Sequence, residues 1–273
     1  MPELPEAETI ARDLDGALHG AVVRSVRVDR ADVLRGTTAR ALGTRLRGAT
    51  IGGVSRRAKS VVFTFTGGDR IVVTPRFTGA LLLDGAPDDA YTCLRITLAD
   101  DRLLRYHDVR RLGTVTLLAH AAFDAWSGAL GPEPLDPTLT AERFSGILRG
   151  SRRAVKSILM DQRRLAGVGN IYANEACWLA GIRPARRGSS LRLAECLALL
   201  LHLRAVLSAS IAARGTTFRD FRDAYGARGA FATQLQAYGR GGEACRRCGA
   251  TLRTTHALAG RQTVWCPDRE CQR

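Results

Sequence analysis

A change of hydrophobic pattern near the middle of the chain constrains the fold more than any other feature. Before residue 131, short apolar runs with strand-like character alternate with turn clusters of glycine, threonine and aspartate. After Pro132, Pro134 and Pro137, apolar residues recur at helical spacing. Evenly spaced short strands are typical of a sandwich or barrel, and a proline-rich stretch between two patterns is typical of a linker. The sequence therefore predicts two domains of different class.

Individual elements follow from the same patterns. Ile10, Leu14 and Leu18 repeat every four residues and predict an amphipathic helix over residues 6–19. We expect strands over residues 22–28, 61–65, 71–73, 80–83, 94–98, 103–106 and 114–118. We expect helices over residues 141–148, 154–160, 171–179 and 191–211, and a mobile, basic and glycine-rich loop over residues 216–242.

The charge balance indicates a polyanionic partner. The chain holds 41 Lys and Arg against 26 Asp and Glu, a formal net charge of +15. Such a surface favours nucleic acid, with a ribosomal or anionic-membrane partner as the alternatives. No apolar run approaches the roughly 20 residues of a membrane span, and the N-terminus lacks signal-peptide features. We therefore expect a cytoplasmic protein that does not enter a membrane.

Lysine and asparagine are rare enough to be informative. Lys59 and Lys156 are the only lysines, and Asn170 and Asn174 are the only asparagines. A compact ammonium and a planar guanidinium are not equivalent at a crowded site. The few retained lysines and asparagines are therefore candidate functional residues, although chance survival at the surface is an alternative for each one.

The first eight residues contain the functional groups that imine-forming catalysis requires. Removal of Met1 would give Pro2 a free secondary amine, and the carboxylates of Glu3 and Glu6 lie close to it in sequence. An amine that adds to a sugar carbon beside a proton-shuttling acid is the requirement for such covalent chemistry. The alternative is ordinary capping, because proline and acids favour the first turn of a helix.

Four of the seven cysteines lie near the C-terminus. They form the pattern Cys245-x2-Cys248-x17-Cys266-x4-Cys271, which suits one structural zinc ion bound by four thiolates. A disulfide pair is the alternative, which a cytoplasmic location disfavours. The last gap is wider than usual, so the assignment of Cys271 is the weakest of the four. The other cysteines stand in apolar surroundings and are predicted to be core residues: Cys93, Cys177 and Cys196.

Two further segments suit contacts with phosphate or DNA. The segment from Gly167 to Asn170 precedes a helix and can turn several amides toward an anion, with Lys156 nearby in sequence. Arg110 and Arg111 lie in a turn after a strand, where they are either solvated or inserted into an opened duplex. Neither segment is decisive alone.

Taken together, these motifs resemble the formamidopyrimidine-DNA glycosylase and endonuclease VIII family of base-excision-repair enzymes. The similarity covers essentially the whole chain, and the N-terminus has the formamidopyrimidine form. The segments that carry it are Pro2–Glu6, Arg56–Lys59, Asp161–Tyr172, Gly229–Arg240 and Arg261.

This resemblance implies an α+β protein of two domains. A β-sandwich with a catalytic N-terminal helix would occupy residues 1–131, a helix-two-turn-helix domain residues 132–233, and a zinc β-hairpin finger residues 234–273. It implies a monomer associated with the nucleoid that binds damaged double-stranded DNA. The enzyme would remove a damaged, oxidised base and nick the strand by β,δ-elimination.

The resemblance also implies roles for individual residues. Pro2, Glu3, Glu6 and Lys59 would be catalytic. Zinc would be structural and take no part in the chemistry. The residues expected to bind DNA are Phe77, Arg110, Arg111, Leu112, Lys156, Asn170 and Arg261.

Two positions depart from the family's pattern and leave the preferred lesion open. Phe77 stands where the family has methionine, and Leu112 stands where it has the wedging phenylalanine. Oxidised purines, oxidised pyrimidines and bulkier adducts all stay possible substrates. Two other functional classes also stay open, a catalytically silent binder of damaged DNA and an RNA-associated zinc protein.

Overall fold

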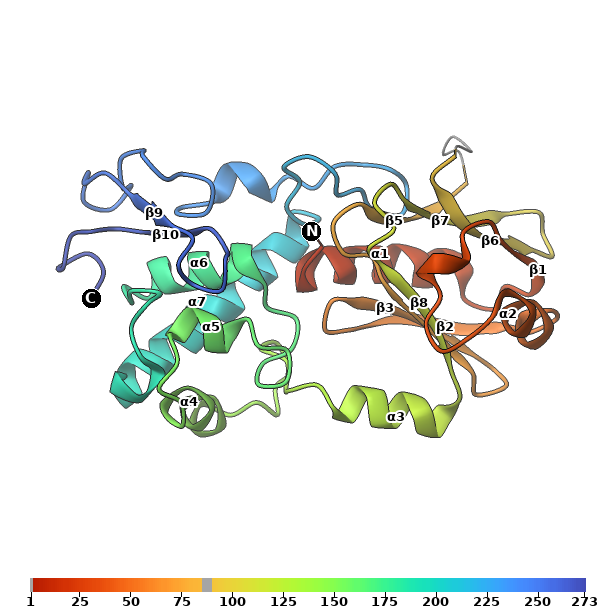
Figure 1. Cartoon of the computed structure of the whole chain (residues 1–273), viewed down its shortest axis with the longest axis horizontal. Coiled ribbons are helices and arrows are strands. Elements are labelled where there is room, and N and C mark those ends of the chain that lie inside the picture. The colour runs from red at the N-terminus through yellow and green to blue at the C-terminus, as the bar shows by residue number, and fades with distance from the viewer. Residues whose placement is uncertain (1, 85–89) are drawn as a thin grey trace. The chain divides into compact units, whose positions relative to one another are not determined.

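The chain divides into two units, which are described separately (Figure 1). In this computed structural model the described residues are 2–84 and 90–273. Unit 1 consists of the chain up to Ala129 together with Ile211–Ala232, and unit 2 consists of Leu130–Ser210 and Thr233–Arg273. Our predicted boundaries instead placed residues 211–232 in the helical domain and treated the finger as a third domain.

Unit 1 contains two antiparallel four-stranded sheets. The first has the order β1 (Val23–Val28), β6 (Thr92–Leu98), β7 (Leu103–Asp108), β5 (Gly79–Leu83). The second has the order β2 (Ile51–Arg57), β3 (Ser60–Phe65), β4 (Arg70–Thr74), β8 (Thr114–Leu118). The helical elements are α1 (Leu4–Leu18), a 3₁₀ turn (Ala31–Val33), α2 (Ala39–Leu46) and α3 (His120–Gly128).

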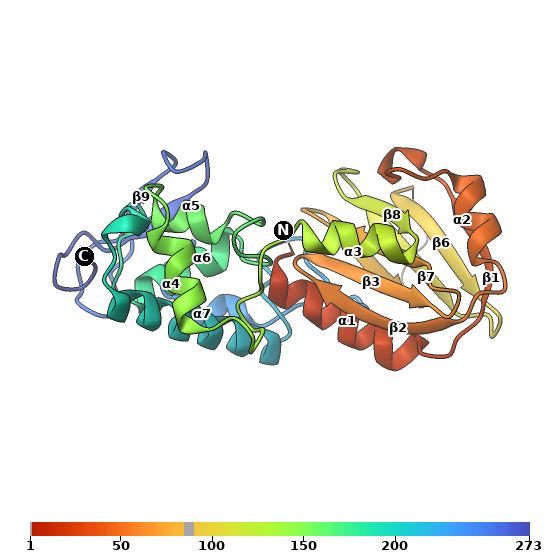
Figure 2. The same ribbon diagram turned by 90° about the horizontal axis from the view of Figure 1, so that it is seen from below.

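Helix α1 packs against β2 and β3 and shares one hydrophobic core with both sheets (Figure 2). Its apolar stripe is the one predicted from the four-residue repeat, and all three members are fully buried. The helix begins at Leu4, two residues before the predicted start, because proline is well suited to the first turn and Glu3 takes the N-cap position. The predicted β-sandwich with an N-terminal helix is confirmed.

All seven predicted strands are present, but the sequence did not predict β2. Its segment contains Gly52 and Gly53, and a register shift between Ile51 and Gly53 brings Ile51 and Val54 to the buried side. A bulge of this kind removes the two-residue alternation that indicates a strand. Helix α3 was missed because it buries no residue, and α2 because it is short and contains Gly43.

Unit 2 is helical and ends in a short hairpin. Its helices are α4 (Ala141–Arg149), α5 (Val155–Leu159), α6 (Asn170–Leu179) and α7 (Leu193–Ala212), all near their predicted positions, and α7 runs two residues into unit 1. A short 3₁₀ turn (Gly188–Ser190) precedes α7, and another (Phe231–Gln234) follows it and spans the boundary between the units. Strands β9 (Arg253–Thr255) and β10 (Thr263–Trp265) form an antiparallel hairpin.

Helix α7 is long and apolar enough to pass for a membrane span by length and composition, with a mean hydropathy of 1.6. Our expectation that no apolar stretch approaches the length of a membrane span was therefore wrong for residues 193–212. A core helix passes the same test, and one face of α7 is buried in the protein. Cys93, Cys177 and Cys196 are buried, as predicted.

Candidate active site and DNA-binding residues

The N-terminal end of α1 is held in place by Glu6. Pro2, Glu3 and Glu6 are all buried, and Glu6 is fully so. One oxygen of the Glu6 carboxylate accepts a hydrogen bond from the Glu3 backbone N–H (2.8 Å), and the other accepts from the Thr216 N–H (2.7 Å). Glu6 therefore fixes the chain next to Pro2 and ties it to the segment after α7. Met1 lies outside the described residues.

Gly215 allows this close approach. Its φ is +87°, and a Cβ atom there would lie 3.1 Å from Glu6 Cγ and 3.2 Å from its Oε1. A side chain at residue 215 would therefore meet both an unfavourable backbone conformation and the carboxylate that holds the N-terminus.

Lys59 lies in the tight turn between β2 and β3. Ala58, directly before it, has φ of 55° in the left-handed region. Arg56 Nε donates to Glu8 Oε2 of α1 (2.8 Å), and Arg57 Nε donates to Ser127 Oγ of α3 (3.0 Å). The turn that presents Lys59 is thus fixed to a helix on either side.

Glu8 is the α1 end of this attachment. Burial acts to raise its pKa, but the guanidinium groups of Arg56 and Arg12 outweigh burial and hold the pKa of Glu8 below its ordinary value. The carboxylate is therefore ionised at neutral pH, and its bond to Arg56 is charge-assisted.

The predicted wedge residues lie on two loops that touch each other. Phe77 belongs to the loop between β4 and β5, and Arg110 and Leu112 belong to the loop between β7 and β8. The Arg110 guanidinium lies 5.1 Å from the centre of the Phe77 ring, a cation–π contact. Leu112 is 40% exposed, so a large apolar side chain projects from the surface at this point.

Gly113 makes the packing of these loops possible. A Cβ atom there would lie 1.9 Å from the Tyr106 hydroxyl and 2.7 Å from the Thr74 carbonyl oxygen. Both distances are well below van der Waals contact, so any other residue would push the two loops apart. The glycine that follows Leu112 therefore sets the spacing of the wedge.

Asp108 joins the two loops and was not singled out by sequence reasoning. It is fully buried. Its carboxylate accepts hydrogen bonds from the Thr78 hydroxyl (2.5 Å), the Tyr106 hydroxyl (3.1 Å) and the backbone N–H groups of Arg110 (3.2 Å) and Gly113 (2.8 Å). Burial and this carboxylate raise the pKa of Tyr106 well above its ordinary value, so Tyr106 stays a donor.

The segment after α7 is bonded to the rest of unit 1 and within itself at several points. Buried Asp223 accepts from the N–H groups of Tyr225 (3.0 Å) and Ala227 (2.8 Å) and pairs with Arg214, which also pairs with Asp13 of α1. Phe221 and Ala224 belong to the core of unit 1. The predicted loop is therefore irregular but defined, and Phe218 and Tyr225 are its exposed large hydrophobic side chains.

In unit 2, Asn170 is the first residue of α6. Gly167 before it has φ of +92°, and the side chain of Gln162 closes this turn by accepting from the Gly167 N–H (2.9 Å) and donating to the Val168 carbonyl (2.9 Å). The N-terminus of an α-helix favours an anion, because the helix dipole is positive at that end. The predicted phosphate site is therefore a built turn followed by a ten-residue helix.

Lys156 lies inside unit 2, only 1% exposed. Its ammonium donates to the Gln262 carbonyl (2.6 Å) and to the Thr263 hydroxyl (2.7 Å), in the stretch that directly follows exposed Arg261. A direct contact of Lys156 with DNA stays a prediction. The bonds in the structure attach the Arg261 turn to α5.

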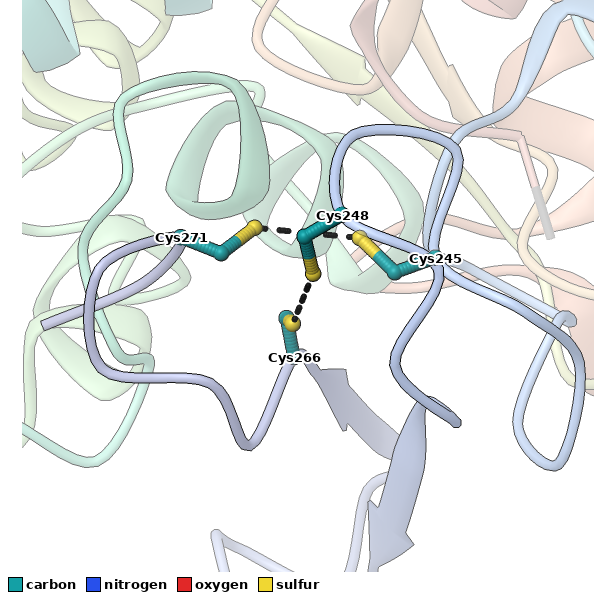
Figure 3. Close-up of side chains that lie close together, drawn as sticks. All are labelled: Cys245, Cys248, Cys266 and Cys271. Carbon is teal, nitrogen blue, oxygen red and sulfur yellow. Dashed lines mark hydrogen bonds between the residues drawn. The ribbon is translucent and has the colours of Figure 1, made fainter.

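The four C-terminal cysteines converge on one point (Figure 3). Their sulfur atoms all lie within 4.8 Å of one another, with Cys245 and Cys271 3.7 Å apart and Cys248 and Cys266 3.4 Å apart. These separations exceed a disulfide bond of about 2.05 Å. They are close to the edge of roughly 3.8 Å that a tetrahedral zinc–thiolate site requires. Cys271 is thus positioned with the other three despite its wider spacing.

The chemistry of these thiols also suits a cation. Burial and neighbouring thiols raise the pKa of Cys266 to about 11, whereas N–H donors outweigh burial and lower that of Cys245 to about 6. These donors are the backbone N–H groups of Arg247 and Cys248. Four such thiols cannot all ionise together without a positive ion among them.

Arg247 and Glu175 dock the finger on α6. Arg247 lies over the Trp178 ring (4.3 Å) and donates to the carbonyl oxygens of Trp178 (3.0 Å) and Cys271 (3.0 Å). Glu175 accepts from the consecutive N–H groups of residues 236–238 at the entrance to the finger. Neither attachment could be inferred from sequence spacing, because both join segments more than 60 residues apart.

Comparison with known proteins identifies the family. The family model "Formamidopyrimidine-DNA glycosylase N-terminal domain" matches residues 1–115, and "Formamidopyrimidine-DNA glycosylase H2TH domain" matches residues 130–222. The chain belongs to the formamidopyrimidine-DNA glycosylase family. This is a family of base-excision-repair DNA glycosylases that are also lyases at abasic sites, so the chain is an enzyme of that class.

Named relatives match over the full length. The formamidopyrimidine-DNA glycosylase of Thermomicrobium roseum is 42% identical, over 100% of this chain and 99% of the relative. That of Roseiflexus sp. is 40% identical, over 100% of both chains. Such coverage includes the C-terminal cysteines, which lie outside both family models.

Solved structures of the same family match the fold of this chain. A Lactococcus lactis enzyme of this family in complex with DNA containing N7-benzyl-Fapy-dG matches with a TM-score of 0.91 at 33% identity, over 100% of both chains. The same enzyme in complex with DNA containing an abasic site also matches with a TM-score of 0.91, over 99% of both chains. A third complex of that enzyme holds an oxidised pyrimidine.

Proposed function

We propose that this protein excises oxidised bases from duplex DNA through an imine formed by the Pro2 amine and then nicks the strand by β,δ-elimination. It acts as a monomer in the cytoplasm, on the nucleoid. Pro2, Glu3, Glu6 and Lys59 form the catalytic group. Phe77, Arg110, Arg111 and Leu112 fill the space left by the extruded nucleotide.

The reaction is a sequence of balanced steps. The Pro2 nitrogen bonds to sugar C1′ as the glycosidic bond breaks, and the bonding electrons leave with the damaged base. The base takes up one proton, which balances the proton that the Pro2 nitrogen loses. Glu3 gives a proton to the ring oxygen as the sugar opens to an iminium ion. Loss of a C2′ proton then expels the 3′ phosphate, loss of a second sugar proton expels the 5′ phosphate, and water hydrolyses the imine.

The observation that carries this proposal is the anchoring of the N-terminus by Glu6. A nucleophile at a free chain end is useful only if that end is held still, because misplacement by about 1 Å can cost a hundredfold in rate. Both oxygens of Glu6 are used to hold the backbone, at Glu3 and at Thr216. Glu6 therefore positions the amine, which leaves Glu3 as the proton donor.

Unit 2 provides residues that bind the DNA backbone. Asn170, Arg261 and Lys156 support binding of phosphates. The four cysteines would hold one zinc ion, whose role is to shape the Arg261 arm, the β9–β10 hairpin of residues 253–265. A small hairpin of this kind depends on its metal for folding. The zinc supplies no chemistry to the reacting sugar.

Borohydride trapping on abasic-site duplex tests the proposal. The processed protein should form a covalent complex, and Pro2→Gly or an N-terminal extension should suppress it strongly, because the nucleophile is then changed or acylated. A set of single-lesion duplexes would identify the damaged base. Equal trapping by an N-terminally extended protein would contradict the mechanism, and binding to damaged DNA without any excision would indicate a silent binder.

A further inference from the structure

Asn174 is the one rare residue for which the proposed function supplies no role. It is one of only two asparagines in the chain, and the other, Asn170, lies one helical turn earlier on α6. Asn174 is fully buried. An asparagine in a helix interior is unfavourable by propensity, so a position that keeps one needs a reason.

The side-chain amide of Asn174 bonds on both sides. Its nitrogen lies 2.6 Å from the Asn170 carbonyl oxygen, 3.4 Å from Asn170 Oδ1 and 3.3 Å from the Gln262 carbonyl oxygen. Its oxygen accepts from the Val264 backbone N–H (2.8 Å). One amide group therefore contacts the residue predicted to bind phosphate on α6 and the backbone on either side of Thr263.

This chemistry requires an amide. The nitrogen must donate to carbonyl oxygens while the oxygen accepts from an N–H, and among side chains of this size only asparagine offers both. An aspartate would keep the acceptor and place a second oxygen against the Gln262 carbonyl. An alanine would leave the Val264 N–H without its acceptor.

We propose that Asn174 is a positioning residue that holds the Arg261 turn in register with Asn170, so that the two side chains bind neighbouring phosphates of the same DNA. This inference rests on the proposed function. Arg261 is exposed at the end of a turn whose preceding residues, Ala259 and Gly260, both have positive φ, so its direction depends on what fixes the residues after it.

Lys156 makes the inference testable without unfolding the arm. Its ammonium bonds to the same Gln262 carbonyl and to the Thr263 hydroxyl, so the turn stays attached when Asn174 is changed. Loss of the Asn174 side chain should therefore make the Arg261 turn more mobile without detaching it from α5. Ser210→Ala is the matched control, since it removes another buried hydrogen bond to α6, that of Tyr172, away from the arm.

The experiment measures how much Arg261 contributes to DNA binding in different backgrounds. Binding of a duplex with a stable abasic-site analogue is measured against salt concentration, with and without Arg261→Ala. In the wild-type background, Arg261→Ala should weaken binding about tenfold and flatten the salt dependence by about one unit of slope. In Asn174→Ala and Asn174→Asp, the same change should cost less than about threefold and leave the slope nearly unchanged, because the contact is already weakened.

The outcomes separate the inference from the function on which it rests. If Arg261→Ala has the same effect in the Asn174 variants as in the wild type and in Ser210→Ala, Asn174 is only a structural residue and the inference is wrong. If Ser210→Ala reduces the Arg261 effect as much as Asn174→Ala does, the inference is equally wrong. If wild type does not bind the duplex, or Arg261→Ala has no effect even there, the proposed DNA-binding role itself fails.

Discussion

The two units hold their predicted DNA-binding residues by different means. In unit 1, buried carboxylates accept hydrogen bonds from the backbone, Glu6 at the start of α1 and Asp108 between the wedge loops. In the described residues of unit 2, a buried carboxylate is used only at the entrance to the finger, by Glu175. The Arg261 arm itself is held by the buried side chains of Lys156 and Asn174 and by the cysteine cluster. The site in unit 1 is therefore held by hydrogen bonds within the protein, whereas the arm in unit 2 would depend on the proposed zinc ion as well.

Backbone strain also differs between the proposed sites of the two units. In unit 1, Lys59, Phe77 and Leu112 each directly follow a non-glycine residue with φ between 50° and 55°. Such conformations cost roughly 1 kcal/mol or more each, and they persist only where the surroundings impose them. In unit 2 the turn before Asn170 uses glycine instead, although the Arg261 turn contains one such residue, Ala259, with φ of 53°. Unit 1 therefore stores strain beside its proposed reactive and wedging residues, which rigid anchoring can sustain.

Loss of the proposed metal should have the largest effect and should be confined to unit 2. Cys248→Ser should release zinc and weaken binding to abasic-site DNA by tenfold or more, because the arm loses its shape. The stability of unit 1 toward denaturant should be the same as in the wild type. Metal analysis and DNA titration measure this, with Cys177→Ala as a control outside the cluster. Tetrahedral zinc retained in Cys271→Ser would show that another group is the fourth ligand.

Loss of Asp108 should be the largest change within unit 1. Asp108→Ala leaves the hydroxyls of Thr78 and Tyr106 and the Gly113 N–H without their acceptor, which should cost about 3 kcal/mol or more in the free energy of unfolding. Asp108→Asn keeps one accepting oxygen and should cost less. Denaturant unfolding measures both, with Asp124→Ala, at an exposed position of α3, as the control. A loss below about 1 kcal/mol in Asp108→Ala would mean that the wedge loops are held by other contacts.

Changes at Lys59 should separate charge from shape. Lys59→Ala should flatten the salt dependence of DNA binding by about one unit of slope and slow strand nicking. Lys59→Arg keeps the charge but not the compact ammonium, so the slope should stay while nicking slows. Titration against salt and single-turnover nicking provide the two readouts. An unchanged slope in Lys59→Ala would remove this residue from the DNA interface.

The wedge exchange should have the smallest effect, visible only in specificity. The Phe77 ring can stack on a base, an interaction worth roughly 1–3 kcal/mol, while Leu112 is smaller than the phenylalanine of the family pattern. We expect weaker discrimination by opposite base than in typical relatives. Phe77→Met with Leu112→Phe should sharpen that discrimination in single-turnover excision opposite each of the four bases. An identical four-way pattern would shift attention to the exposed loop at Tyr225.

Sequence reasoning reached the elements and motifs that depend on local pattern. The strands with two-residue alternation, the helix of Ile10 and Leu14, and the cysteine spacing all follow from neighbours along the chain. The bulged strand β2 did not, because its bulge is set by pairing with β3.

The residues that position the proposed functional side chains could not be predicted from the sequence, also because their role depends on contacts made by folding. Asp108, Glu175 and Asn174 are polar residues whose importance lies in partners brought near by folding, and nothing in their local sequence marks them. Asn174 had one weak signal, its rarity. Lys156 was found by rarity too, but its burial against Gln262 could be seen only in the structure.

The central claim is that the Pro2 nitrogen forms the bond to the sugar, and a digest of the trapped complex tests it most directly. After borohydride reduction on abasic-site DNA, nuclease and trypsin would leave a sugar remnant on one peptide, identifiable by mass spectrometry. The account predicts the remnant on the N-terminal peptide that ends at Arg12, attached to Pro2. A remnant on the peptide that carries Lys59, with the N-terminal peptide unmodified, would contradict it.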